Sequence, residues 1–232
     1  MIEIAVYVEG GGDKTATQEE LRRGFDALFV TQRCKAREKR GSLRFICCGG
    51  RDQAYKAFKN ALEVNCQRTN VLLVDSETSI DPVPTNKAKD GEIRIAHLRQ
   101  RAGTEGRGQG DGWVLSDAVA AQIHLMVQCM EAWIVADPET LEEFYKPNFK
   151  KDKLPKRPNL EEESKPDIYA KLEMATEVTQ QDKSNKGKYG KIKHASKLLQ
   201  MIRPDKVAAR CPRFRIFRDW LNQSIENPSD ED

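Results

Sequence analysis

Short apolar runs alternate with helical patterns through the first half of the chain. The apolar runs occupy residues 2–8, 43–48 and 71–74. Between them, apolar positions recur with a helical period over residues 17–31 and 52–64. This β-α-β-α-β order predicts parallel strands that are joined by right-handed helical crossovers.

The apolar stretch over residues 122–129 fits two kinds of element. Read as a strand, its apolar residues alternate with mostly polar ones, and a fourth strand then completes the sheet. Read as a helix, it places His124, Gln128 and Glu131 on one face. We prefer the strand, followed by a helix that begins near Glu131. The pattern therefore predicts an α/β fold with a parallel sheet core and helices on both faces.

The composition changes near residue 146, where a basic segment with three prolines begins. We predict a core over residues 1–145, a linker over 146–165, a helical extension over 166–226 and an acidic tail over 227–232. The extension contains four helical patterns, over residues 166–178, 192–202, 204–210 and 212–224. Because the linker is basic and broken by prolines, these helices are expected to dock elsewhere than on the core. A glycine-rich tract over 103–112 predicts a mobile surface loop.

The composition excludes several classes of protein. The 232 residues are 38% hydrophobic and 32% charged, with a net charge of +3. The chain contains no uninterrupted apolar run of about 18 residues, so no membrane span is predicted. The N-terminus lacks the pattern of a secretory signal. The six cysteines show no CxxC pair, so neither a zinc site nor a disulfide framework is expected. We expect a cytoplasmic protein with reduced cysteines and no membrane partner; a homo-oligomer is compatible with the sequence.

Acidic residues gather directly after the predicted strands. Glu9 ends the first strand before a glycine turn, and Asp13 lies four residues further on. Asp75 and Glu77 follow the third strand, and Glu131 follows the fourth. Ligands bind at the carboxyl ends of parallel strands, and hard cations take oxygen ligands. We therefore predict one or two Mg²⁺ or Mn²⁺ ions, which can activate water for phosphodiester cleavage.

Each of these acidic residues also has an ordinary structural explanation. The VEGGGD motif is compatible with a simple βα turn, and LLVDSE with a strand that ends in polar residues. Glu131 could cap a helix, and Asp137 could end one before a proline. His124 is better explained as a core histidine than as a ligand. A metal site is favoured because the two motifs occur together on successive parallel strands.

Basic residues supply candidate contacts to phosphate. Arg51 follows the Gly49-Gly50 turn at the start of a helix, where backbone N–H groups favour anions. The segment over residues 183–197 contains six lysines and no acid, as a nucleic-acid interface requires. Lys188, Lys191 and Lys193 are the candidates in it, and Tyr189 between them could stack on a base. For any single basic segment, a solvated helix face is the more common explanation.

Two of these motifs together resemble the Toprim domain of topoisomerases, primases and overcoming-lysogenisation-defect (OLD) nucleases. The resemblance rests on Glu9-Gly10 after the first strand and on Asp75-Ser76-Glu77 after the third. The second acid of this pair is Glu where the family has Asp, which still leaves a carboxylate. Asp13 is similar to an additional acid of some OLD-type nucleases. The resemblance implies metal ligation by Glu9, Asp13, Asp75 and Glu77, and a catalytic role for Glu131. It also implies a second metal site that is completed by either Glu131 or Asp137, which flank Trp133.

A narrower resemblance covers nearly the whole chain. The segments HLMVQCMEAWIVADPETLEEFY and KIKHASKLLQMIRPDKVAARCPRF are similar to a bacterial Toprim-like family known only as domain of unknown function four-two-seven-six. Members are often encoded beside AAA-type ATPases in phage-defence clusters. This implies a metal-dependent nuclease of DNA or RNA that acts as a defence effector under the control of a partner AAA/ABC-type ATPase. The alternative is a non-catalytic Toprim-like subunit that docks on the ATPase. A flavodoxin-like nucleotide binder is disfavoured because the GxGxxG and Walker motifs do not occur.

Overall fold

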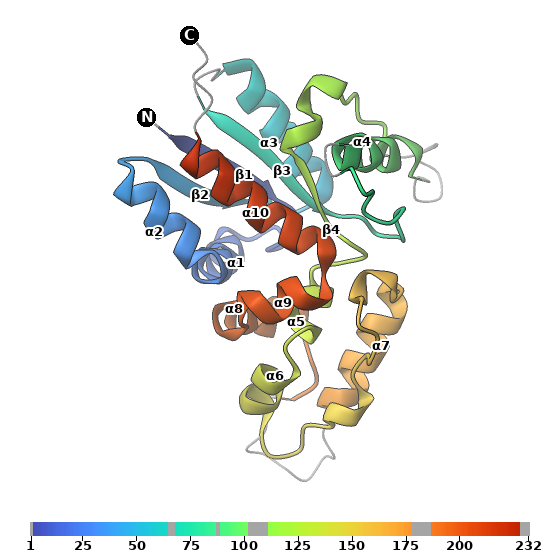
Figure 1. The fold of residues 1–232 in the computed structure, drawn as a ribbon. Helices are drawn as coiled ribbons and strands as arrows, with labels where there is room; N and C mark the ends of the chain where they lie inside the picture. Colours follow the sequence, from blue (N-terminus) through green and yellow to red (C-terminus); the bar gives the residue numbers. More distant parts are fainter. Residues whose placement is uncertain (1, 65–67, 87–88, 102–110, 178–186, 228–232) are drawn as a thin grey trace.

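The computed structural model describes residues 2–64, 68–86, 89–101, 111–177 and 187–227. They form a parallel sheet with helices on both faces and a further group of helices beyond one end of it (Figure 1). The predicted α/β architecture is therefore confirmed. Most of the glycine-rich tract lies outside the described residues, as do parts of the lysine-rich segment and of the acidic tail.

All strand pairs of the sheet are parallel, and the strand order is β2-β1-β3-β4. The strands are β1 (Glu3–Val8), β2 (Ser42–Cys47), β3 (Thr69–Asp75) and β4 (Ile123–Met126). The fourth strand is four residues long, shorter than the eight-residue pattern predicted. Because β1 and β3 are central neighbours, the residues that follow them meet at one edge of the sheet.

Side-chain alternation along the strands gives the sheet two apolar faces. Ile4, Val6 and Val8 pack on one face with α1 (Thr15–Leu28), α2 (Val30–Glu38) and α10 (Pro212–Glu226). Ala5 and Tyr7 face the other way, toward α3 (Arg51–Val64) and α4 (Asp90–Gln100). Burial on both faces explains why the central strands β1 and β3 are almost continuously apolar in sequence, whereas the edge strand β2 is exposed at alternate residues.

The remaining helices gather beyond the carboxyl ends of the strands (Figure 1). They are α5 (Glu131–Val135), α6 (Pro138–Tyr145), α7 (Lys165–Thr176), α8 (Lys191–Met201) and α9 (Pro204–Arg210), with short 3₁₀ turns at Lys151–Lys153 and Leu160–Glu162. A further 3₁₀ turn, at Asp117–Gln122, leads directly into the amino end of β4. The helix predicted to begin near Glu131 is present as α5. The boundaries of α9 agree with the sequence pattern.

The C-terminal helices pack on the core, which corrects the expectation that they dock elsewhere. Helix α8 lies against α1, and α10 lies against β4 and α2. Leu154 and Leu160, in the segment predicted as a linker, are buried in the same apolar cluster as the sheet. Their burial shows why composition was misleading: prolines and lysines dominate the segment, while two leucines anchor it.

The structure contains a helix, α2, that the sequence pattern did not predict. The first predicted helix ends at Leu28, and a second helix, α2, follows directly after Phe29. Its mixed charges concealed it in the sequence pattern.

Among the described cysteines none forms a disulfide; three are buried, one is half-buried and Cys34 is exposed. No helix of the described residues has the length and apolar character needed to cross a membrane.

Candidate metal-binding site

Three carboxylates meet at the carboxyl edge of the sheet. Glu9 follows β1, Asp75 ends β3 and Glu77 lies two residues later. Each offers one carboxylate oxygen, and these oxygens all lie within 4.8 Å of one another. The structure thus brings together the three acids that the two sequence motifs had singled out.

Backbone hydrogen bonds fix the positions of Glu9 and Asp75. The Glu9 amide donates to the Leu73 carbonyl at 3.1 Å, which places Glu9 beside β3. The Glu9 carboxylate in turn accepts from the Asp75 amide at 3.2 Å. Asp75 accepts from the Met130 amide at 3.0 Å, so the turn before α5 holds its side chain. Both carboxylates are therefore oriented by main-chain groups, which move little.

Glu77 is held in a left-handed backbone conformation, with φ of 68°. Such a conformation costs a non-glycine residue about 1–2 kcal/mol and persists only where its surroundings enforce it. Here the Glu77 amide donates to the Gln128 carbonyl at 3.1 Å, and the Gln128 amide donates to the Ser76 hydroxyl at 2.7 Å. Gln128 itself has φ of 63°. The turns after β3 and β4 thus lock each other and present Glu77 to the cluster.

Three basic side chains enter the acidic cluster. Lys165 Nζ lies 2.7 Å from Glu77 and 3.6 Å from Asp75. Lys191 Nζ lies 3.7 Å from Asp75 and 3.8 Å from Glu131. Arg51 donates to Glu9 at 3.1 Å. The site therefore consists of a central group of carboxylates that is surrounded by three positively charged side chains.

Each of these cations is the first residue of a helix: Arg51 begins α3, Lys165 begins α7 and Lys191 begins α8. A positive charge at a helix N-terminus is unfavourable for the helix dipole, so the positions are explained by the site and not by the helices. The same helix N-termini favour anions. The arrangement suits a ligand that carries negative charge, such as a phosphodiester.

Arg51 is the best-anchored of the cations. Its guanidinium donates to Asp111 through Nε at 3.0 Å and Nη2 at 2.8 Å, and to the Asp75 carbonyl at 2.5 Å. Arg101 also binds Asp111, and the Arg51 guanidinium lies 4.8 Å from the centre of the Trp113 ring. Asp111 lies near the C-terminal end of the glycine-rich tract, so that end of the tract is tied to the site.

Asp75 is the most perturbed carboxylate of the cluster. It is 1% exposed, and burial raises the pKa of its side chain to about 7. Lys191 and Lys165 oppose this shift, whereas the charges of Glu9 and Glu131 reinforce it. Carboxylates that crowd one another in a buried position repel when all are ionised. A divalent cation would relieve that repulsion, so the oxygen-rich donor set fits a hard ion such as Mg²⁺ or Mn²⁺.

Glu131 lies next to the cluster but is separated from it by Lys191. It is completely buried, and one of its oxygens accepts from the Tyr189 hydroxyl at 3.0 Å. Its other oxygen has no hydrogen-bond partner among the described residues. Tyr189 is itself 7% exposed, so the expectation that this ring stacks on a base is wrong: it is a buried partner of Glu131.

Several other candidates lie outside the carboxylate cluster. Asp13 is exposed and does not join it, so the structure places this predicted ligand in solvent. Asp137 caps α6 and pairs with Arg203 at 2.5 Å. His124 is buried beside Phe217, at 4.8 Å between ring centres, as expected for a core histidine.

The lysine candidates separate into two environments. Lys191 reaches the acidic cluster, as described above. Lys188 pairs with Glu173 at 2.8 Å on the surface, and Lys193 is exposed. Lys165 was missed because it lies in the segment interpreted as a linker. Its position before Pro166, where a helix begins, was the available signal.

The fold and the site define a class: parallel α/β proteins with a cluster of acids at the carboxyl edge of the sheet. A family model described as Domain of unknown function (DUF4276) matches residues 8–222. Because this match spans most of the chain, the protein belongs to that family, as its sequence resemblance predicted. No curated protein and no solved structure matches the chain.

Proposed function

We propose that this protein is a metal-dependent nuclease that cleaves phosphodiester bonds in DNA or RNA. The observation that carries the proposal is the convergence of Glu9, Asp75 and Glu77, with carboxylate oxygens within 4.8 Å of one another. These residues would hold one or two Mg²⁺ or Mn²⁺ ions. When bound, such an ion supplies an activated water and stabilises the charge of the departing oxygen.

The residues around the acids support a phosphodiester substrate. Arg51, Lys165 and Lys191 come from three different helices and surround the carboxylates. Arg51 is held by Asp111, Glu9 and the Asp75 carbonyl, so its positive charge is fixed beside the carboxylates, where it would attract a phosphate. Because contacts to phosphate carry no base identity, we expect binding that depends on salt and only weakly on sequence.

The biological setting in this proposal comes from the sequence resemblance. We propose an effector of anti-phage defence whose activity is controlled by a partner AAA/ABC-type ATPase. The tie between Arg51 and Asp111, at the end of the glycine-rich tract, offers a physical route for control. A partner that binds near Asp111 and changes its pairing with Arg51 would move the guanidinium relative to Glu9 and shift the population toward the competent state.

The test combines metal binding with cleavage. The purified chain is titrated with Mn²⁺ by calorimetry and then incubated with plasmid, linear DNA and total RNA, with and without the ATPase. Mn²⁺-dependent cleavage that is lost in Asp75→Ala is expected. Asp13→Asn is the matched control: this exposed carboxylate belongs to the same glycine turn but not to the cluster, so its activity should equal that of the wild type. Absence of Mn²⁺ binding would refute the proposal.

One observation favours the second candidate, a non-catalytic subunit that docks on an ATPase. Lys165 and Lys191 already balance the charge of Asp75 and Glu77 within the chain. A site of this kind could be stable without any cation. Measuring the affinity for the ATPase with Mn²⁺ and with a chelator separates the two functions. A docking subunit would bind the ATPase with equal affinity in both conditions.

A further inference from the structure

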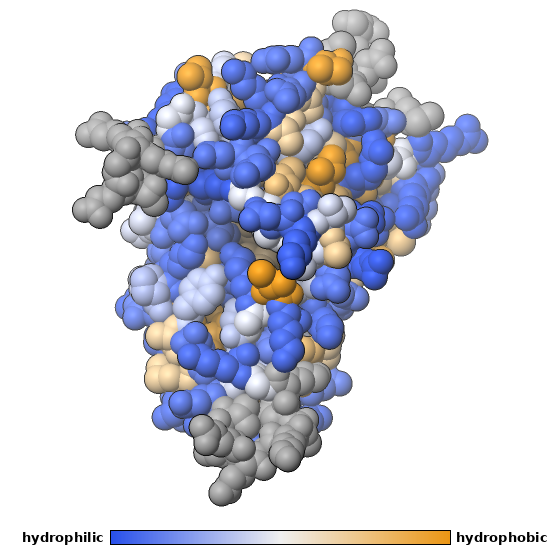
Figure 2. Space-filling view, turned by 180° about the vertical axis from the view of Figure 1, so that it is seen from behind, coloured by the Kyte–Doolittle hydropathy of each residue, from blue (hydrophilic) through white to orange (hydrophobic). Residues whose placement is uncertain are grey.

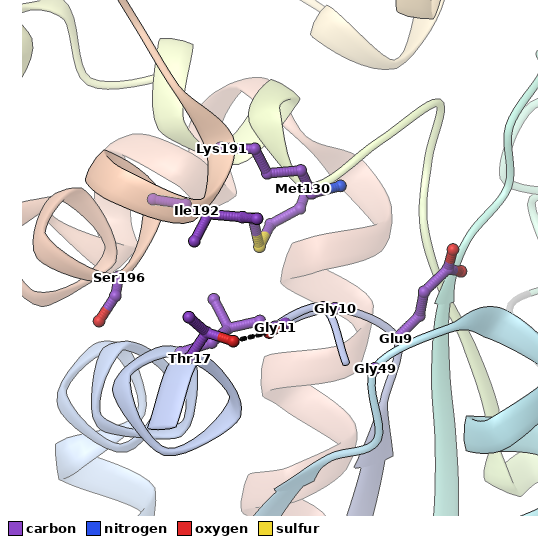
Figure 3. Close-up of a pocket in the computed structure, with 12 residues that line it drawn as sticks. Glu9, Gly10, Gly11, Thr17, Gly49, Met130, Lys191, Ile192 and Ser196 are labelled. Atoms are coloured by element: carbon purple, nitrogen blue, oxygen red, sulfur yellow. Dashed lines mark hydrogen bonds between the residues drawn. The ribbon is translucent and has the colours of Figure 1, made fainter. Parts of the chain in front are cut away.

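We propose that a cavity beside the carboxylate cluster receives one unstacked nucleobase, so that the substrate is single-stranded nucleic acid. This inference rests on the proposed nuclease function and adds its substrate class. The cavity has a volume of about 250 Å³ and is bounded at one end by Glu9. It lies between the glycine turn at residues 10–12, helix α1 and the first turns of α8 (Figure 3).

The lining of the cavity suits the face of a planar ring. Leu21, Met130, Ile192 and Ala195 provide apolar walls. Figure 3 shows Met130 and Ile192 together on one side, with Thr17 and the glycine turn on the other. The exposed surface on the face seen in Figure 2 is mostly hydrophilic, with apolar side chains in small groups. An apolar cavity next to the carboxylate cluster is therefore a local feature, and it can bind an apolar part of a substrate.

The hydroxyl groups of the lining are already engaged. The Thr17 hydroxyl has the carbonyls of Gly11 and Lys14 as acceptors for its one proton, and the Ser196 hydroxyl donates to the carbonyl of Glu20. Of the residues that line the cavity, Lys191 alone is a cation, and its ammonium is directed to Asp75. A phosphate group would find few free donors inside. The cavity is therefore suited to the base, while the phosphate stays at the carboxylates and cations outside.

The size of the cavity agrees with a single base. An engineered apolar cavity of about 150 Å³ is large enough to bind benzene. The present cavity is larger, at about 250 Å³, and leaves room for a heterocycle with its exocyclic groups. Its position next to Glu9 means that a base could enter it while its own phosphodiester reaches the proposed metal site.

Glycine at position 12 keeps the cavity open. Its φ is +64°, and a Cβ built there would have Ile192 Cδ1 and Thr17 Oγ1 as its nearest atoms, both at 3.9 Å. Both neighbours line the cavity, so any side chain at this position begins inside it. Asn tolerates a left-handed backbone better than most residues. Gly12→Asn is therefore a filling variant that should fold.

Single-stranded substrate follows from the energy of exposing a base. A base within a duplex is stacked and paired, and extruding it costs a few kcal/mol. A single strand lacks most of that cost, and contact with a protein surface can replace its stacking. At equal salt we therefore expect the chain to bind a single strand at least about tenfold more tightly than the matching blunt duplex.

The experiment measures binding and cleavage separately. Fluorescence anisotropy with Ca²⁺ in place of Mn²⁺ follows a short labelled single strand, its blunt duplex, and a series in which one abasic site is moved along the strand. At one position along the strand, the abasic site should weaken binding to the wild-type protein about tenfold. Gly12→Asn and Ile192→Ala should weaken the intact strand similarly and become insensitive to that abasic site. Ile192 is 63% exposed, so its truncation should leave the fold intact.

Met174→Ala is the matched control, because Met174 is also exposed (46%) but lies on α7 away from the cavity lining. It should bind like the wild type. Equal affinity for single strand, duplex and every abasic strand, unchanged in Gly12→Asn, would overturn the base pocket even if Mn²⁺-dependent cleavage is intact. Conversely, abasic-sensitive binding with no cleavage in Mn²⁺, either with or without the ATPase, would uphold the pocket and refute the nuclease.

Discussion

Asp75 and Asp137 are both almost completely buried, and their surroundings shift their pKa values in opposite directions. Asp75 is 1% exposed and Asp137 is 0% exposed. Burial raises the pKa of Asp75 to about 7, with the neighbouring acids adding to the shift. Burial also disfavours the charged form of Asp137, but hydrogen bonds from Arg203 and Thr140 outweigh it and lower the pKa to about 2.

The difference lies in how far each charge is satisfied within the chain. Asp137 accepts from the backbone and side chain of both Arg203 and Thr140. Asp75 accepts one backbone hydrogen bond and shares two lysines with Glu77 and Glu131. A fully satisfied carboxylate stabilises a fold, whereas crowded carboxylates are the arrangement expected of a functional site. The comparison therefore separates a structural aspartate from a candidate metal ligand.

The strongest test of this separation is Asp75→Ala. We expect Mn²⁺-dependent cleavage to fall at least about 100-fold, because a catalytic metal contributes several kcal/mol to stabilising the transition state. Calorimetry should show loss of Mn²⁺ binding, while circular dichroism should show an unchanged fold. Retained binding and cleavage would place Asp75 in the same structural class as Asp137.

Asp137→Ala should show the reverse behaviour. Loss of the α6 cap and of the hydrogen bonds to buried partners should lower the free energy of unfolding by about 2–3 kcal/mol. Urea denaturation monitored by fluorescence measures this change. Mn²⁺ affinity under native conditions should equal that of the wild type. A weakened metal affinity in the folded variant would contradict the structural assignment.

The pH dependence of stability distinguishes the two aspartates without any ligand. Because the pKa of Asp75 is raised in the folded state, the wild type should lose stability as the pH rises from about 4 to about 7. Asp75→Asn cannot ionise and keeps an acceptor for the Met130 amide, so it should avoid this loss. Above pH 7, without metal, we expect it to be about 1–2 kcal/mol more stable than the wild type. Equal urea midpoints at pH 8 would contradict the raised pKa.

The smallest expected effect concerns the lysines. Lys191→Gln removes an ammonium 3.7 Å from Asp75, and a positive charge so close disfavours a bound cation. Mn²⁺ affinity should therefore increase roughly three- to tenfold. Lys188→Gln is the control, since Lys188 pairs with Glu173 on the surface and its loss should leave the affinity unchanged. A decrease in Lys191→Gln would show that this lysine supports the site and does not compete with the ion.

The order of the strands and the acidic centre of the site could be predicted from the amino-acid sequence alone. The apolar runs marked the strands because both faces of the sheet are buried. Glu9, Asp75 and Glu77 could be predicted to converge because parallel strands end at one edge. These features depend on local periodicity and on a simple rule of topology, and a single sequence contains all the information that both require.

The charges that surround the acids could not be predicted without the three-dimensional packing. Lys165 is 88 residues from Glu77 in sequence, and their contact requires α7 to pack beyond the sheet. The packing of α8 and α10 on the core overrode a composition typical of a linker and extension. The opposite pKa shifts of Asp75 and Asp137 follow from which partners packing brings within hydrogen-bond distance. Long-range electrostatics depends on that packing, and no local pattern of residues encodes it.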